Sequence, residues 1–192
     1  MGLHPRLRAY FGAIPAGMTG FGEGMFASVG TPRRWLRPLI ALVADPDVLF
    51  PVWERDVRFT VVNLPMVDAG RPAIAGERIF HLPGGDRVMR DLIVATSAGL
   101  VDVLGTRRRF RALFTAEVVD GALRLDSTRV AVRLGPRHLR IPRFLAPRVA
   151  LGERYSDDDG LQHVEVTVSL PLLGRVYEYA GSFRYRLKVG DS

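Results

Sequence analysis

The residues best suited to chemistry lie in an aromatic segment near the C-terminal end of the chain. Between positions 175 and 187, aromatic side chains fall at every second position and would share one face of a strand: Tyr177, Tyr179, Phe183 and Tyr185. Gly181 falls on the same face, where a missing side chain permits a bend or the close approach of another backbone or a ligand. Buried tyrosine hydroxyls need hydrogen-bond partners. The pattern predicts either ordinary core or the wall of a cavity that holds something amphipathic.

Three charged residues alternate with apolar neighbours and are further candidates. Arg90, Asp102 and Glu153 each share the parity of apolar residues on either side, and a buried charge must be paired or functional. We expect structural ion pairs or rim positions in preference to an acid–base set. Together with the aromatic segment, these three residues form the candidate ligand-binding set.

Patterns for catalysis and metal binding are incomplete. The chain has no cysteine, and its four histidines show no metal-ligand spacing. Ser97, in ATSAG, lacks the first glycine of a nucleophile elbow and falls in a strand-to-strand turn. The acidic turn 157–160 lacks the other ligands of an EF-hand. We assign no catalytic residue, metal or cofactor; we leave an enzymatic activity open and favour a non-catalytic function.

The N-terminal quarter of the chain is interpreted as a cover. Residues 4–11 predict a short helix, and the glycine-rich stretch 16–26 predicts a packing loop, because it lacks the strand–loop–helix order of a phosphate loop. Thr31 and Pro32 predict the start of a helix over Arg33–Ala44, kinked or split at Pro38. Its arginines and apolar residues would also suit peripheral contact with a membrane, but we favour a helix that covers a sheet.

From Asp56 onward the hydrophobic period is two, and short turns join the apolar segments. A change of parity along 122–134 predicts a bulge at 126–128. The prediction is an α+β fold, with N-terminal helices covering a strongly curved, mostly antiparallel sheet, a partial barrel of about 8–9 strands. We expect a single domain over 1–192, with a helical and glycine-rich cover at 1–50 and the antiparallel sheet at 51–189.

Composition limits the partners. Hydrophobic residues make up 47% and charged residues 24%, as in ordinary soluble globular proteins, and no signal sequence or transmembrane segment is evident. We therefore expect a cytoplasmic protein. The net charge is +7, carried almost entirely by arginine, which suits the codon usage of a GC-rich genome. Because aromatic residues do not interleave with the arginines of 107–111 on one face, we do not expect a nucleic-acid partner.

Several motifs together resemble a known family over nearly the whole chain. The segments GFGEGMF, GTPRRWLRPL, LFPVWERDVRFTVVN, FHLPGGDR and LPLLGRVYEYAGSF resemble DUF4166, a bacterial family of unknown function. The resemblance implies no established activity and no catalytic residues. It also implies an association, because such domains occur alone or beside saccharopine-dehydrogenase-like or short-chain-dehydrogenase-like domains.

Two functions follow as hypotheses. The first is a non-catalytic binding module that holds a small amphipathic or lipid-like ligand in the curved sheet. The alternative is a protein-interaction or substrate-presenting partner of an NAD(P)-dependent oxidoreductase. A cavity behind Tyr177, Tyr179 and Tyr185 would favour the first.

Overall fold

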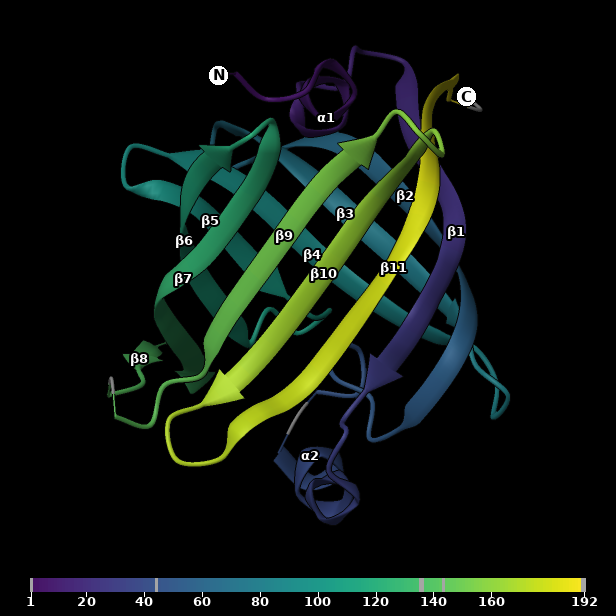
Figure 1. Ribbon diagram of the computed structural model, residues 1–192. Helices are drawn as coiled ribbons and strands as arrows, with labels where there is room; N and C mark the ends of the chain where they lie inside the picture. The colour runs from purple at the N-terminus through teal and green to yellow at the C-terminus, as the bar shows by residue number, and fades with distance from the viewer. Residues whose placement is uncertain (1, 44, 135–136, 143, 191–192) are drawn as a thin grey trace.

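The computed structural model describes residues 2–43, 45–134, 137–142 and 144–190, and this part of the chain is almost entirely antiparallel β-structure (Figure 1). Ten strands close into a barrel in the order β6-β5-β4-β3-β2-β1-β11-β10-β9-β7, and β7 pairs with β6 to complete the ring. β8 pairs with β7 outside the ring. The strands are β1 (Met18–Gly30), β2 (Trp53–Asp68), β3 (Arg71–His81), β4 (Arg87–Thr96), β5 (Gly99–Leu104), β6 (Phe110–Val119), β7 (Ala122–Leu134), β8 (Arg137–Arg140), β9 (Arg148–Ser156), β10 (Leu161–Leu170) and β11 (Gly174–Val189).

The expected α+β fold, a partial barrel covered by N-terminal helices, is wrong. The glycine-rich stretch that was expected to be a packing loop is β1, which pairs with β2 on one side and with β11 on the other. This strand joins the first and last parts of the chain, so the sheet closes instead of leaving a concave face for helices.

Glycines in β1 make room for the aromatic rings of β11. In the register of the two strands, Gly24 lies opposite Phe183 and Phe26 lies opposite Gly181. A Cβ atom on Gly24 would come within 2.5 Å of the Phe183 Cβ, so each large ring is set against a missing side chain. Packing of aromatic residues over glycine offsets the weak strand propensity of glycine, which is why this segment forms a strand.

Packed rings fill a large part of the barrel interior. The rings of Phe26 and Phe59 stack with centroids 3.8 Å apart, and Phe80 contacts both Phe26 and Tyr179. Tyr177 is fully buried, and its hydroxyl accepts a hydrogen bond from the backbone N–H of Phe50 at 3.4 Å. The inward-facing stripe of β11 therefore contributes mainly to the core.

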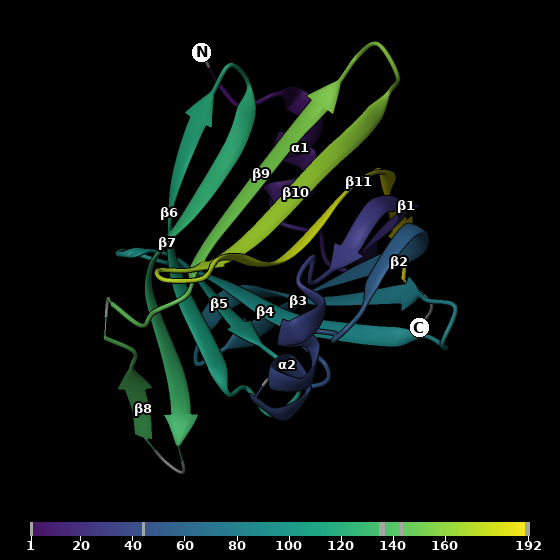
Figure 2. The same cartoon turned by 60° about the horizontal axis from the view of Figure 1, so that its bottom comes forward.

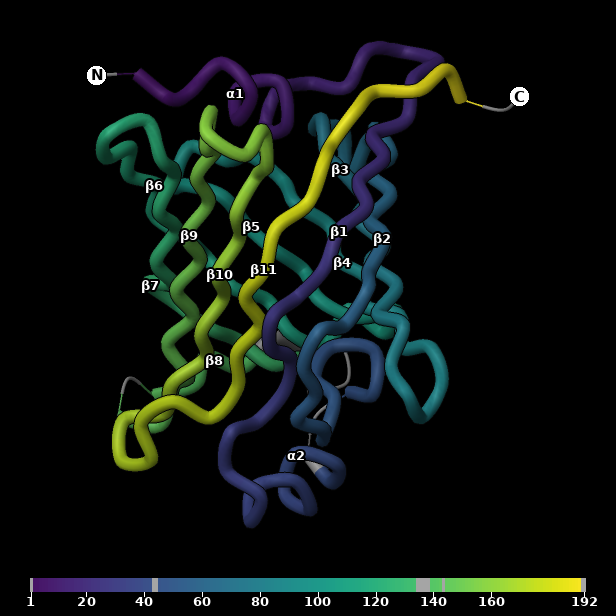
Figure 3. The backbone as a smooth tube through the Cα atoms, turned by 45° about the vertical axis from the view of Figure 1, so that its right-hand side comes forward, coloured from purple at the N-terminus to yellow at the C-terminus, as the bar shows by residue number. Residues whose placement is uncertain are grey.

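The helices lie at opposite ends of the barrel and do not cover a face of the sheet (Figures 1 and 3). The predicted helix near residues 4–11 is confirmed as α1 (Pro5–Phe11), whose N-terminus is capped by the His4 side chain. The second helix begins as a 3₁₀ turn, η1 (Arg34–Leu36), and continues as α2 (Arg37–Val43). The expected helix is divided directly before Pro38 into η1 and α2, one of the two outcomes predicted for this proline, which itself falls in the first turn of α2, where proline is tolerated. Ala44 lies outside the described residues.

The bulge expected at 126–128 is confirmed. Leu113 pairs with Arg129 whereas Phe114 pairs with Ser127, which leaves Thr128 as the extra residue of β7. The extra residue switches the parity of the strand and keeps Leu125 and Val130 both buried. No helix within the described ranges is long and apolar enough to cross a membrane.

Candidate functional site

Polar side chains gather inside the barrel around the guanidinium of Arg78. They come from α1 and from seven strands, so no single stretch of sequence contains the set. We call this set the interior polar cluster: Tyr10, Asn63, Arg78, Asp91, Asp102, Glu153, Gln162, Tyr179 and Tyr185.

Strand alternation and one glycine explain how β3 and β4 bring their side chains into the cluster. Gly76, Arg78 and Phe80 alternate along β3 and face the interior, and Gly76 pairs with Asp91 of β4. A Cβ atom on Gly76 would collide with Oδ1 of Asp91. The absence of a side chain at this position gives the Asp91 carboxylate its space.

The central contact of the cluster is an ion pair. Nη1 of Arg78 donates to Oδ2 of Asp91 at 2.6 Å, and the side chains are 15% and 4% exposed. Burial lowers the pKa of Arg78, but Asp91 and the nearby Tyr179 and Tyr10 hydroxyls more than compensate, and the pKa lies well above its usual value. Loss of either partner would leave an uncompensated buried charge, so the pair is expected to stay intact in the folded protein.

Two further carboxyl groups in the cluster favour their protonated forms. Burial raises the pKa of Glu153 to about 7, although a hydrogen bond from the Gln162 amide opposes the rise. Burial also raises the pKa of Asp102 well above the usual value of a carboxyl group, and the nearby charge of Asp91 adds to the rise. The charges of Arg78 and Asp91 compensate each other, and burial disfavours the ionised forms of Asp102 and Glu153.

The cluster has hydrogen-bonding capacity that the described part of the chain does not use. Oδ1 of Asp91 and Oδ1 of Asp102 are buried and have no hydrogen-bond partner among the described residues. The Tyr185 hydroxyl lies near Asn63 but likewise has no partner with hydrogen-bond geometry there. Because buried polar atoms are nearly always paired, these atoms point to a bound molecule or to ordered water.

The structure brings together four of the eight residues proposed from the sequence. Asp102, Glu153, Tyr179 and Tyr185 belong to the interior polar cluster. Tyr177 and Phe183 belong to the aromatic core. At Gly181 a Cβ atom would collide with the Met25 carbonyl oxygen, so this glycine permits the close approach of another backbone, one of the roles expected for it.

Arg90 lies on the outer wall of the barrel. It pairs with Glu77 on β3 at 2.7 Å, and its side chain is 46% exposed. The sequence could not show this, because β4 is apolar on both faces: Leu92 and Val94 face outward, whereas Met89 faces inward beside Asp91. Asp91 could not be found from the sequence for the same reason. Arg78 lies on β3, where its alternation with Phe80 is a signal for an inward-facing side chain.

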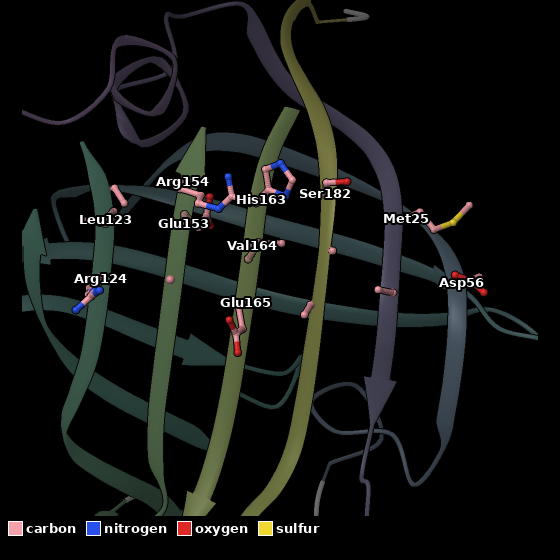
Figure 4. A pocket seen from close by; sticks show the side chains of 15 residues that line it. Met25, Asp56, Leu123, Arg124, Glu153, Arg154, His163, Val164, Glu165 and Ser182 are labelled. Atoms are coloured by element: carbon pink, nitrogen blue, oxygen red, sulfur yellow. The ribbon is translucent and has the colours of Figure 1, made fainter. Parts of the chain in front are cut away.

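A groove of about 640 Å³ on the outer wall crosses β1, β11, β10 and β9 (Figure 4). Arg154, His163 and Glu165 project from this wall, and Ser182 lies directly opposite His163 in the strand register. Nε2 of His163 lies 2.9 Å from Oδ2 of Asp159, but no hydrogen bond joins His163 to Ser182 within the described residues, so a nucleophile–base pair is not formed. Among these residues no three His, Asp or Glu side chains gather as a metal site either.

The structure defines a closed antiparallel β-barrel whose wall encloses a buried polar cluster. The chain belongs to the family described as a domain of unknown function, DUF4166, whose model matches residues 3–183. It is 22% identical over 186 residues to the uncharacterized protein YndH of Bacillus subtilis (strain 168), in an alignment that covers 95% of this chain and 90% of that protein. No solved structure matches the chain.

Proposed function

We propose that the barrel is a binding module for a small amphipathic ligand, whose polar end lies at the interior polar cluster. The observation that carries the proposal is the pair of buried oxygens without partners, Oδ1 of Asp91 and Oδ1 of Asp102. A ligand that donates a hydrogen bond to Asp91 and exchanges one with the carboxyl group of Asp102 would satisfy both.

The surroundings of the cluster favour the amphipathic character. Tyr10 belongs to the cluster, and its ring also packs against Phe183 and Tyr185, at centroid distances of 5.7 and 4.6 Å. Apolar ring surface therefore begins directly beside the polar atoms. Because burial disfavours further charge at the cluster, an uncharged group such as a hydroxyl or amide suits it better than an isolated ion.

The route into the barrel would pass α1. This helix closes one end of the barrel, and its Leu7 and Tyr10 side chains are buried. The backbone N–H of His4 donates to the Gly121 carbonyl at 3.0 Å, and the imidazole stacks on Tyr155. Displacement of a seven-residue helix would open the barrel without breaking the strand pairs of the ring.

The test is the mass of the protein purified from cells, recorded under native conditions and again after denaturation. We expect a reproducible excess mass that is lost on denaturation and that is reduced in Asp102→Leu, which removes one of the two buried carboxyl oxygens without a partner. Glu77→Leu on the outer wall is the matched control and should keep the excess mass. An apoprotein mass in the wild type, or an equal loss in both variants, would contradict the proposal.

Two expectations from the sequence remain predictions. One is a cytoplasmic location, and the other is association with an NAD(P)-dependent oxidoreductase, which rests on the resemblance alone. Retention of such an enzyme on the immobilised protein at low salt would support the second.

A further inference from the structure

The end of the barrel that carries α2 exposes large apolar side chains beside arginines. Trp35 is 59% exposed in η1, and Leu42 is 82% exposed in α2. Leu172, in the turn between β10 and β11, is 91% exposed. We call the following residues the α2-end surface: Arg33, Arg34, Trp35, Leu39, Leu42, Phe144, Leu145 and Leu172.

The helix and the β10–β11 turn form one rigid unit at this end. Leu36 and Ile40 are buried against Val176, with Leu170 and Leu173 packed around them. Arg33 lies beside the turn, because its Nη2 would be 3.5 Å from a Cβ atom on Gly174. The buried side of the helix is thus used for packing, and the opposite side presents Trp35, Leu39 and Leu42 to solvent.

A third segment extends the surface. Phe144 and Leu145 follow β8 and are exposed, and Arg140 beside them is also exposed. Figures 1 and 2 place β8, the β10–β11 turn and α2 around the same end of the barrel. The apolar side chains of this end therefore come from three separate segments.

Both ends of the barrel carry exposed arginines, but acidic turns accompany those beside α1. Arg33 and Arg34 are exposed and have no ion pair among the described residues. At the other end, α1 carries the exposed Arg6 and Arg8, but the turns beside it carry Asp120 and the run 157–159, all aspartate. An anionic surface would therefore attract the α2 end and repel the acidic turns.

We propose that the α2-end surface docks the barrel on an anionic lipid membrane. Trp35, Leu42 and Leu172 would enter the interfacial region, and the two arginines would contact lipid phosphates. The apolar side chains are highly exposed and come from three separate segments. A fluid lipid interface accepts such protruding tips, whereas a protein partner would need a matching pocket for each of them.

The charge requirement is tested by flotation with vesicles of phosphatidylcholine, with and without phosphatidylserine. We expect the wild type to bind only the anionic vesicles. Arg33→Ala with Arg34→Ala should weaken binding about 25-fold, since each arginine near such a surface is worth roughly a factor of five. Arg6→Ala with Arg8→Ala, a pair of exposed arginines on α1 at the opposite end, is the matched control and should bind within about twofold of the wild type.

The apolar contact is tested separately. Leu42→Ser with Leu172→Ser should abolish binding to the same vesicles, whereas Val189→Ser, at a position 82% exposed near the opposite end, should leave it unchanged. In a Trp53→Phe background, the emission of Trp35 should shift to shorter wavelength when anionic vesicles are added. Failure of the wild type to float with anionic vesicles at low salt, or equal losses in the test and control variants, would overturn the proposal.

Discussion

The barrel interior changes the protonation of the Glu153 side chain. Its pKa is raised by burial from 4.5 to about 7, so the folded protein holds the proton more tightly than the unfolded chain does. The protonated form therefore favours folding below pH 4.5, and this stabilisation is lost as the pH rises toward 7. Glu153→Gln keeps an acceptor for Gln162 and removes the titration.

The variant should gain stability relative to the wild type as the pH rises from 4.5 to 7, by up to about 3 kcal/mol in the free energy of unfolding. Urea denaturation at several pH values measures this difference. Glu165→Gln, an exposed position on the neighbouring strand β10, is the control for removal of a carboxylate from the barrel wall. A constant difference between Glu153→Gln and the wild type over that range would contradict the proposed burial of the carboxyl group.

At this scale the sequence was informative where a charge stood out against apolar neighbours of the same parity. Asp102 and Glu153 could be selected in this way and lie inside the barrel, whereas Arg90, selected by the same pattern, lies on the outer wall. The partner Arg78 could not be assigned, because its role depends on Asp91 of the adjacent strand. Alternation gives the face of a side chain, but not which side chains of other strands meet it.

Among the elements, the pairing of β1 with β11 depends most on individual residues. Gly181→Ala would force a Cβ atom against the Met25 carbonyl oxygen and the Phe26 Cα atom. We expect the variant to lose about 1–3 kcal/mol of stability or to fold poorly, because backbone atoms must move to accept the methyl group.

The matched control is Gly152→Ala in β9, where a Cβ atom would meet nothing within 4 Å. This variant should be as stable as the wild type or slightly more stable, since alanine restricts the unfolded chain more than glycine does. Thermal unfolding of both variants makes the comparison. A Gly181→Ala protein as stable as Gly152→Ala would mean that the two strands do not approach as closely as described.

The strands after Asp56 were predictable because their turns and period-two patterns agree. β1 was not predictable from its own residues, because four of its positions are glycine and strand propensity counts against them. Its strand character depends on the rings of β11, more than 150 positions away in the sequence. Because the sequence does not show this pairing, it predicts an open sheet covered by helices. The closed sheet has no open face for helices to cover.

For the whole molecule, closure predicts that the ten barrel strands unfold as a unit. Each has a neighbour on both sides, so their amide hydrogens should exchange slowly and with similar protection. β8 has one partner and four residues, and it should exchange much faster. Hydrogen–deuterium exchange with peptide-level mass spectrometry distinguishes the two classes, and protection of β8 equal to that of β7 would contradict this prediction.

Closure of the ring also bears on self-association. A strand at the edge of an open sheet offers unpaired N–H and C=O groups that can recruit another chain and begin fibril growth. The ring removes such edges from ten strands, and within the described residues the free side of β8 is the remaining edge of the sheet. If the folded protein aggregates through its backbone, we expect growth to begin there, on a strand that has arginine at both ends and is too short to be an effective template.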